Sequence, residues 1–224
     1  MLRGDLKEAL NLYEKSLDAL REPGDIDPQE AQERQKLLDT NSWNFGCGLL
    51  QSQELARGWQ LYEYGLRTPA GGKQRWQRAL RKPFAASVLP IWRGESLAGK
   101  RLLLLEEQAI GDVMMFLTLL PALLEEASSV DLMLSERLVP IYRRSLGDSV
   151  KIWTHSDARK GHLVPDNYDF QSPLGSVCQH RFTNIESYAK RVPMLIFNSP
   201  RRDKLRNDYL SVNSQPIKRL IGIS

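Results

Sequence analysis

The strongest hydrophobic pattern in this chain lies between residues 100 and 124. Four consecutive leucines at positions 102–105 predict a short strand that is buried on both faces, as in a parallel sheet. A second apolar run follows Gly111 and Asp112, and its residues recur at helical spacing: Val113, Phe116, Leu117, Leu120 and Leu124. A strand, a loop and a helix form the first half of a βαβ unit. Because ligands bind beside the loops that follow the strands of such sheets, the pattern predicts an active-site edge here.

Strands and helices continue to alternate after this unit. The expected elements are a strand at 130–135, a helix at 138–146, a strand at 150–153, a polar loop at 157–167, a strand end and turn at 168–176, and a helix at 184–190. Pro140 would lie in the first turn of its helix, where proline is tolerated. Residues 199–207 are charged and are expected to be exposed. The alternation over residues 100–190 indicates a parallel, Rossmann-like sheet.

The beginning of the chain contains an internal repeat. Residues 4–20 carry one apolar helical face, formed by Leu6, Ala9, Leu10, Tyr13 and Leu17. The same face recurs 49 positions later, from position 6 to position 55, as Leu55, Gly58, Trp59, Tyr62 and Leu66. Glu14 and Ser16 are matched by Glu63 and Gly65. A repeat of this kind predicts stacked helices that bury their faces against one another.

This repeated face resembles the second helix of a tetratricopeptide repeat, where small residues around an aromatic residue let two helices pack closely. Residues 41–51 would supply the preceding helix, with Phe45, Gly46 and Leu49 at the expected places. A tetratricopeptide period is about 34 residues, so the longer spacing implies extra residues. We place them in the polar stretch 25–38, as an extension of a helix. The chain begins where a first helix would end, and we therefore expect further repeats upstream.

Residues 67–93 contain seven basic and no acidic residues. One interpretation is a solvated linker at the junction between the helices and the sheet. The other is a surface that binds an anion such as phosphate, phospholipid or nucleic acid. Nucleic acid is the least favoured of these ligands because no recognised nucleic-acid module accompanies the charge.

The overall composition limits the class of protein. The 224 residues are 42% hydrophobic and 26% charged, as in ordinary globular domains. No apolar run approaches the roughly 20 residues of a membrane-spanning helix, and the charged N-terminus shows no secretory signal. Cys47 and Cys178 are far apart in sequence, which predicts free thiols and a cytoplasmic location. The formal net charge of +4 permits an anionic partner without requiring one.

Four segments together resemble bacterial tetratricopeptide-repeat glycosyltransferases. They are G-W-Q-L-Y-E-Y at 58–64, P-x-W-x-G-E-x-L-A-G-K at 90–100, L-L-L-x-E-Q-x-x-G-D at 103–112 and Y-D-F-Q-S-P-L-G-S at 168–176. The sheet region is similar to the acceptor-side half of heptosyltransferase-like GT-B enzymes. This resemblance implies an α segment followed by an α/β segment, namely tetratricopeptide-like helices and then one Rossmann-like domain, half of a GT-B fold.

The resemblance also implies a division of the chain. We expect helical repeats at 1–67, a basic junction at 68–99, an acceptor-side domain at 100–218, and the first strand of a donor-binding domain at 219–224. The nucleotide sugar would bind to that second domain, so the chain alone would be inactive. The implied reaction is a metal-independent, inverting sugar transfer to a hydroxyl of a glycan, protein or lipid-linked acceptor, with no cofactor beyond the nucleotide-sugar co-substrate.

The candidate site follows from the same resemblance. In the heptosyltransferases the aspartate of the G-D turn is the proposed general base, and Asp112 occupies that position. Glu107, Gln108 and Gly111 would bind substrate around it. The alternatives are a helix cap for Asp112, solvation or pairing with a cation for Glu107, and an amide that braces the loop for Gln108. Ala109 replaces the glycine usual in the family, which reduces the backbone freedom of this loop.

Other chemistry finds less support in the sequence. His155, His162 and His180 lie in loop-like segments without a metal-binding motif, and we expect no metal site. Trp43, Trp59 and Trp92 are expected to be packing residues, with Trp92 between the helices and the sheet. The rival hypothesis to a glycosyltransferase is a non-catalytic scaffold whose tetratricopeptide-like helices bind a partner protein.

Overall fold

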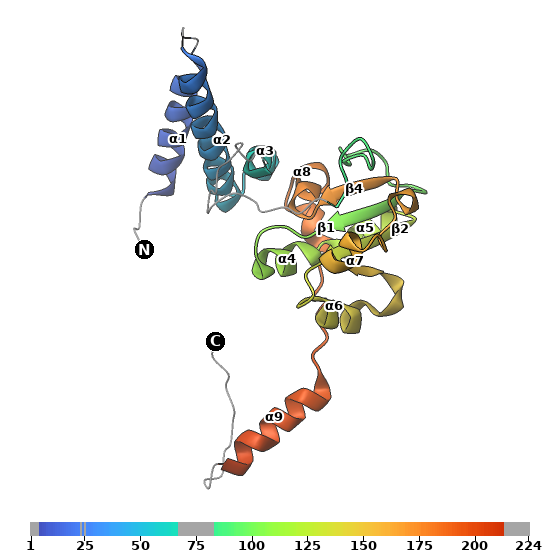
Figure 1. Ribbon diagram of the computed structural model, residues 1–224. Coiled ribbons are helices and arrows are strands. Elements are labelled where there is room, and N and C mark those ends of the chain that lie inside the picture. Colours follow the sequence, from blue (N-terminus) through green and yellow to red (C-terminus); the bar gives the residue numbers. More distant parts are fainter. Residues whose placement is uncertain (1–4, 23, 25, 67–82, 213–224) are drawn as a thin grey trace.

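The computed structural model describes residues 5–22, 24, 26–66 and 83–212, and it confirms an α segment followed by an α/β segment (Figure 1). The first segment contains α1 (Leu6–Arg21), α2 (Pro28–Gln51), α3 (Leu55–Tyr62) and the 3₁₀ helix η1 (Glu63–Leu66). A four-stranded parallel sheet with interleaved helices follows. The predicted terminal strand at 219–224 and most of the basic stretch, residues 67–82, lie outside the described residues.

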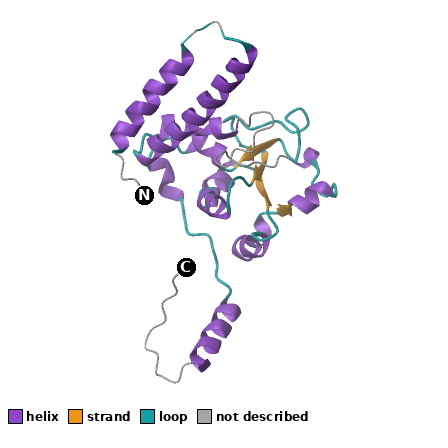
Figure 2. Cartoon of the chain, turned by 60° about the vertical axis from the view of Figure 1, so that its left-hand side comes forward, coloured by secondary structure: helices purple, strands orange, loops and turns teal. Residues whose placement is uncertain are grey.

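Helices α1 and α2 form an antiparallel pair, as both views show (Figures 1 and 2). Asp5 caps α1 by accepting a hydrogen bond from the Lys7 amide at 2.9 Å, which satisfies one of the unpaired amides of the first turn. Between the helices, Leu17 is buried against Phe45 and Leu49. The polar stretch before residue 39 continues the same helix from Pro28, which confirms that it lengthens α2.

Helices α2 and α3 pack so closely at Gly46 that a side chain there would push them apart. A Cβ on Gly46 would lie 2.8 Å from the Tyr62 nitrogen and 2.9 Å from the Gly58 oxygen. Both atoms belong to the backbone of α3 and cannot move without shifting that helix. The small residue at position 46 therefore sets the distance between the two helices.

The sheet has the strand order β3-β2-β1-β4 and is parallel throughout. Its strands are β1 (Arg101–Leu105), β2 (Ser129–Leu134), β3 (Ile152–Thr154) and β4 (Phe170–Pro173). Strand β1 pairs with β2 on one side and with β4 on the other, so that Leu104 is opposite both Leu132 and Ser172. The four leucines of β1 are all buried. The predicted inner strand of a parallel sheet is thus confirmed.

Successive leucines of β1 face opposite sides of the sheet. Leu102 and Leu104 belong to the larger core, which includes residues of the helices α4 (Ile110–Leu117), α5 (Leu120–Glu126), α6 (Val139–Leu146) and α8 (Cys178–Arg181). Leu103 and Leu105 belong to a smaller core with Leu89, Met133, Leu163 and Tyr168. Both faces of the strand are therefore covered, as its unbroken apolar run requires.

Two predicted elements between residues 113 and 167 need correction. The apolar run after Asp112 forms two helices, because Pro121 lacks the amide hydrogen that would continue α4 into α5. The expected polar loop at 157–167 contains part of α7 (His155–Arg159) and the 3₁₀ helix η3 (Pro165–Asn167). Thr154 and Asp157 form a reciprocal cap that starts α7, with the Asp157 amide donating to Thr154 Oγ1 at 3.0 Å and the Thr154 amide donating to Asp157 Oδ2 at 2.9 Å.

The segment after residue 168 also differs from expectation. Residues expected to form a strand end and a turn form the complete strand β4, followed by the 3₁₀ helix η4 (Gly175–Val177). The helix expected at 184–190 is the shorter 3₁₀ helix η5 (Glu186–Lys190), and η2 (Gly147–Ser149) follows α6. The charged residues after 199 form α9 (Ser199–Val212), which extends away from the sheet (Figure 1).

Aromatic side chains join the helical segment to the sheet segment. Trp59 and Tyr62 of α3 lie in the same core as Leu104, and their rings are 6.0 Å and 6.3 Å from the ring of Phe116 on α4. The indole of Trp59 donates a hydrogen bond of 2.8 Å to the Tyr188 hydroxyl. Burial of such rings contributes several kcal/mol to the free energy that holds the helical segment against the sheet segment. Trp59 and Tyr62 therefore link the two segments, and Trp92 is buried in the same core.

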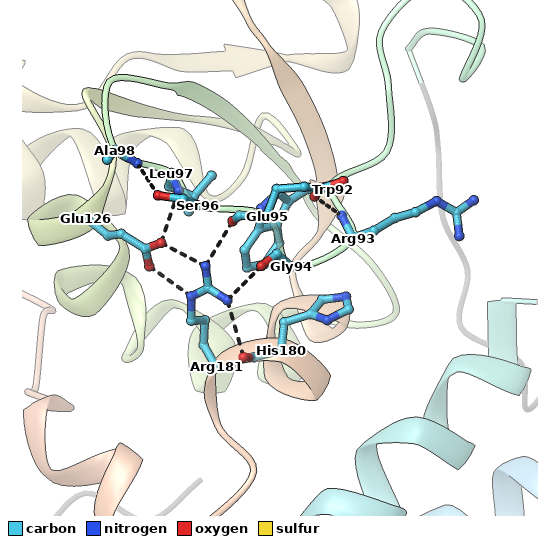
Figure 3. Close-up of polar contacts among 10 residues, drawn as sticks. All are labelled: Trp92, Arg93, Gly94, Glu95, Ser96, Leu97, Ala98, Glu126, His180 and Arg181. Carbon is cyan, nitrogen blue, oxygen red and sulfur yellow. Dashed lines mark hydrogen bonds and ion pairs between the residues drawn. The ribbon is translucent and has the colours of Figure 1, made fainter.

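Trp92 also belongs to a clamp that holds the loop at residues 92–98 (Figure 3). Arg181 donates two hydrogen bonds to the carboxylate of Glu126, at 2.8 Å and 2.7 Å, and a third to the Glu95 carbonyl at 3.0 Å. Its guanidinium also lies 4.7 Å from the centre of the Trp92 ring. Glu126 accepts a further hydrogen bond from the Leu97 amide at 3.1 Å. One arginine thus ties the loop to α5 and α8.

Two of the sequence motifs that carry the family resemblance contain residues that stabilise this part of the fold. Gly94 has a φ of 98°, in the left-handed region that favours glycine, and a Cβ there would lie 2.7 Å from the His180 ring. The side-chain amide of Gln171 donates to the carbonyls of Leu89 at 2.7 Å and Phe84 at 3.1 Å. Gln171 thus attaches the chain before β1 to β4, and Gly94 lets the same chain approach His180 of α8 closely. The motifs at 90–100 and 168–176 therefore have structural reasons to contain these residues.

We predict that Gly46→Ala lowers the free energy of unfolding by about 1–3 kcal/mol, because the new methyl group meets the α3 backbone. Gly48→Ala is the matched control two residues away, where a Cβ would meet only the flexible side chain of Leu10. The control should stay within about 1 kcal/mol of wild type. Urea denaturation measures both, and equal effects would contradict the proposed helix crossing.

We predict that Glu126→Gln destabilises the protein by about 1–2 kcal/mol at pH 7, because Arg181 loses its charged acceptor. The hydrogen bonds from Arg181 hold the pKa of Glu126 below its ordinary value of 4.5. The clamp therefore contributes stability above that value, and the contribution is lost as the pH falls through the lower folded-state pKa. Urea denaturation at a series of pH values should show the two proteins converging in acid. Exposed Glu33→Gln is the control, and a pH-independent difference would contradict this assignment.

Candidate functional site

The loop after β1 carries Glu107 and Gln108, and the first turn of α4 carries Gly111 and Asp112. This loop leaves the sheet at the carboxyl end of an inner strand, and ligands of open parallel sheets bind beside such ends. Gln108 has a φ of 56°, an uncommon left-handed conformation for a residue other than glycine. Strained positions of this kind persist only where surrounding contacts hold them. The loop geometry is therefore imposed by its neighbours.

The contact that holds Gln108 comes from the helical segment. Its side-chain amide donates a hydrogen bond to the hydroxyl of Tyr62, a buried residue at the end of α3. Periodicity in the sequence identified Tyr62 as a packing residue, because it occupies the aromatic position of the repeat. Its contact with a loop 46 residues away was not predicted. Thus the helices do more than pack against the sheet: they position its candidate site loop.

Asp112 lies in the first turn of α4 and is partly buried. Its Oδ2 accepts a hydrogen bond of 3.1 Å from the Ala109 amide, which caps the helix. Oδ1 has no hydrogen-bond partner among the residues that the structure describes. The capping alternative is thus observed, and one carboxylate oxygen remains able to accept a proton. Its catalytic role stays a prediction.

The other two predicted residues do not lie on the same surface. Glu107 is buried, and Gly111 is exposed. A Cβ on Gly111 would meet no atom within 4 Å, so space does not require glycine there. The neighbouring Glu106 accepts hydrogen bonds from the Ser135 amide at 2.6 Å and from His155 Nε2 at 2.8 Å. The two carboxylate oxygens of Glu106 therefore hold the end of β1 to the end of β2 and to the start of α7.

Gln108 and Asp112 both line a cleft of about 960 Å³ between the helical and sheet segments. The cleft is bounded by the last turns of α2, by α3, by the first turns of α4, and by η5. Besides Gln108 and Asp112, its lining consists of Trp43, Cys47, Leu50, Gln53, Leu55, Trp59, Tyr62, Met115, Phe116, Ile185, Glu186, Tyr188, Ala189 and Arg191. This volume lies within the range of about 300–1,000 Å³ that is usual for ligand pockets.

The walls of the cleft are mainly apolar, with a few polar groups at its edges. Tyr188 is fixed by its hydrogen bond from Trp59, and burial raises the pKa of its hydroxyl, which therefore stays neutral at physiological pH. The charged groups are the carboxylates of Asp112 and Glu186 and the guanidinium of Arg191. Among the described residues, no group of three or more histidine, cysteine, aspartate or glutamate side chains is arranged to hold a metal ion.

Comparison with known proteins gives one distant similarity. The chain is 26% identical over 156 residues to Protein FlbA of Caulobacter vibrioides. The match covers 64% of this chain and 24% of FlbA, so the chain spans about a quarter of the length of that curated relative. No protein-family model matches the chain, and no solved structure matches it significantly. Within the described residues, no helix has both the length and the apolar composition needed to cross a bilayer.

We predict that Tyr62→Phe releases the side chain of Gln108, because the substitution removes only the hydroxyl that accepts its hydrogen bond. The side-chain amide resonances of Gln108 should shift in a ¹H–¹⁵N NMR spectrum, and the free energy of unfolding should fall by about 0.5–1.5 kcal/mol.

Tyr13→Phe is the matched control, since Tyr13 occupies the same position in the first copy of the repeat, far from the loop. It should leave the Gln108 resonances unchanged. Identical Gln108 spectra in Tyr62→Phe and wild type would contradict the positioning role of Tyr62.

Proposed function

We propose that this chain is the helical-repeat and acceptor-side part of a glycosyltransferase. In this proposal α1–α3 are tetratricopeptide-like helices, and the sheet segment is a Rossmann-like half of a GT-B fold. The cleft holds an acceptor hydroxyl, and Asp112 removes its proton as a sugar is transferred from a nucleotide-sugar donor. The acceptor is carried by a glycan, a protein or a lipid.

One observation carries the proposal: Asp112 and Gln108 line the same cleft at the carboxyl end of an inner parallel strand. A general base must reach the proton that it removes, and Oδ1 of Asp112 is the oxygen left for this role when Oδ2 caps α4. Gln108 offers a side-chain carbonyl and amide beside it, which suit recognition of sugar hydroxyls. Glu107 and Gly111 do not line the cleft as it is described, and the proposal gives them no contact with substrate.

A non-catalytic binding module is the second candidate, and the apolar walls of the cleft favour it. A hydrophobic groove between helices can receive an apolar segment of a partner protein. The two candidates differ in what they require of Asp112. An enzyme needs its carboxylate for turnover, whereas a binding module needs at most its hydrogen bond to the helix.

We predict that Asp112→Asn in the complete protein lowers the rate of sugar transfer by at least about 100-fold, the usual contribution of a general base. Asparagine can still accept the hydrogen bond from the Ala109 amide, so the melting temperature should change little. The measurement is turnover with a panel of nucleotide sugars and hydroxyl acceptors, together with thermal unfolding.

Asp157→Asn is the matched control. Asp157 caps α7 in the same way at the end of β3, and hydrogen bonds from Thr154 lower its pKa, but it does not line the cleft. Its replacement should alter stability and leave turnover intact. Unchanged turnover in Asp112→Asn would remove Asp112 from the mechanism and leave the binding module as the better proposal.

A further inference from the structure

The cleft beside Asp112 exposes large apolar side chains where a ligand would cover them. Met115 of α4 is 54% exposed, and Ile185 next to η5 is 55% exposed. Both line the cleft together with the more enclosed Trp59 and Phe116. An apolar surface of this kind, bordered by polar groups, is typical of a binding site, because covering it removes apolar area from water.

The charged groups that line the cleft carry no net positive charge that would attract an anion. Two carboxylates, Asp112 and Glu186, face the same space as one guanidinium, Arg191, which gives a formal charge of −1 at the lining residues. The N-terminus of α4 could attract a phosphate, but its Ala109 amide already donates to Asp112. The charges of the lining thus give no net attraction for a phosphorylated or carboxylated ligand, and an uncharged one fits the mainly apolar walls better.

The polar and apolar parts of the lining come from different elements. Gln108 and Asp112 belong to the loop and first turn that follow β1, and their side chains can bind a hydroxyl. Trp43, Leu50 and Leu55 belong to the helical segment and form an apolar wall. A ligand that uses both parts must therefore carry a polar hydroxyl-bearing group and an apolar body.

We propose that this cleft binds an uncharged amphiphile, with its hydroxyl group at Gln108 and Asp112 and its apolar body against the wall formed by the helical segment. That this molecule is the acceptor of a sugar rests on the proposed function. The binding itself does not. The apolar body is either an aliphatic chain, as in a lipid glycoside, or an aromatic ring, as in an aryl glycoside. Both present the same chemistry to this wall.

Alkyl β-glucosides test the proposal because the sugar ring stays constant while the apolar body grows. We expect affinity for the 224-residue chain to rise by about threefold for each added CH₂ group, and hence on the order of 200-fold from methyl to hexyl glucoside. NMR titration at concentrations below micelle formation gives the dissociation constants. Phenyl glucoside carries the same number of carbon atoms as hexyl glucoside, and the tighter of the two identifies an aromatic or an aliphatic body.

Substitutions at exposed positions can locate the binding site because they are expected to leave the stability of the fold nearly unchanged. Met115→Gln and Ile185→Gln together should weaken hexyl glucoside binding by at least about 10-fold and flatten the chain-length series. Leu12→Gln and Phe197→Gln are the controls, because both residues are 60% exposed and neither lines the cleft. The controls should bind as wild type. A series that stays within about threefold from methyl to hexyl, or equal losses in the control variants, would overturn the proposal.

The outcome is separable from that of the proposed function. Asp112→Asn should abolish transfer yet keep hexyl glucoside binding within about 10-fold, since most of the affinity comes from the apolar wall. If glucosides fail to bind while Asp112→Asn still abolishes transfer, the amphiphile proposal is wrong and the enzyme proposal stands. If hexyl glucoside binds as expected while transfer is unaffected, the cleft is a binding site without this chemistry.

Discussion

The burial of β1 on both faces and both edges is the constraint on which the rest of this structure depends. Each of its four leucines contributes about 1.5–3 kcal/mol when transferred from water, and hydrogen bonds to β2 and β4 occupy both edges. In this register Leu104 lies opposite Leu132 of β2 and Ser172 of β4, so the strand is paired along its length on both sides. The carboxyl end of β1 is therefore fixed, and with it the point where the site loop leaves the sheet.

The helical segment supplies the second half of that site. A loop with a left-handed residue needs an external contact, and the Tyr62 hydroxyl provides it from α3. The glycine crossing of α2 and α3 holds Tyr62 in place, and the Trp59–Phe116 contact fixes α3 against α4. The cleft thus belongs to neither segment alone. Helices that formed an independent domain would not be expected to share a buried core with the sheet in this way.

Local patterns in the sequence predicted the elements well where a single periodicity governed them. The four leucines of β1 and the repeated helical face reflect local burial, and Pro140 lies in the first turn of α6, where its missing amide hydrogen needs no partner. The β-loop-α pattern also placed the loop after β1 at an edge of the sheet, and Asp112 and Gln108, which the resemblance singled out, line a cleft there. Short elements such as α7 were missed, although its Thr154–Asp157 cap was visible as a spacing of three residues.

Long-range contacts could not be predicted, because the spacing of residues along the chain carries no information about which distant residues meet. Nothing local indicates that Tyr62 bonds to Gln108, or that Arg181 closes a clamp on Glu126 and Glu95. The burial of Glu107 was equally hidden, because a residue at a strand end can face either the interior or the solvent. The resemblance motifs also mixed two kinds of residue. Gly94 and Gln171 hold the fold, whereas Asp112 faces the cleft, and only the structure separates them.

The central claim is that the helices and the parallel sheet form one folding unit around a shared cleft. Native-state hydrogen exchange at low urea concentrations tests it most directly, because units that unfold together converge on one free energy and one urea dependence. The amides of α3 should converge with those of β1 on the global unfolding free energy. Amides of α3 that open independently at a much lower free energy, while β1 stays protected, would show that the helices are a separate module and would contradict the shared site.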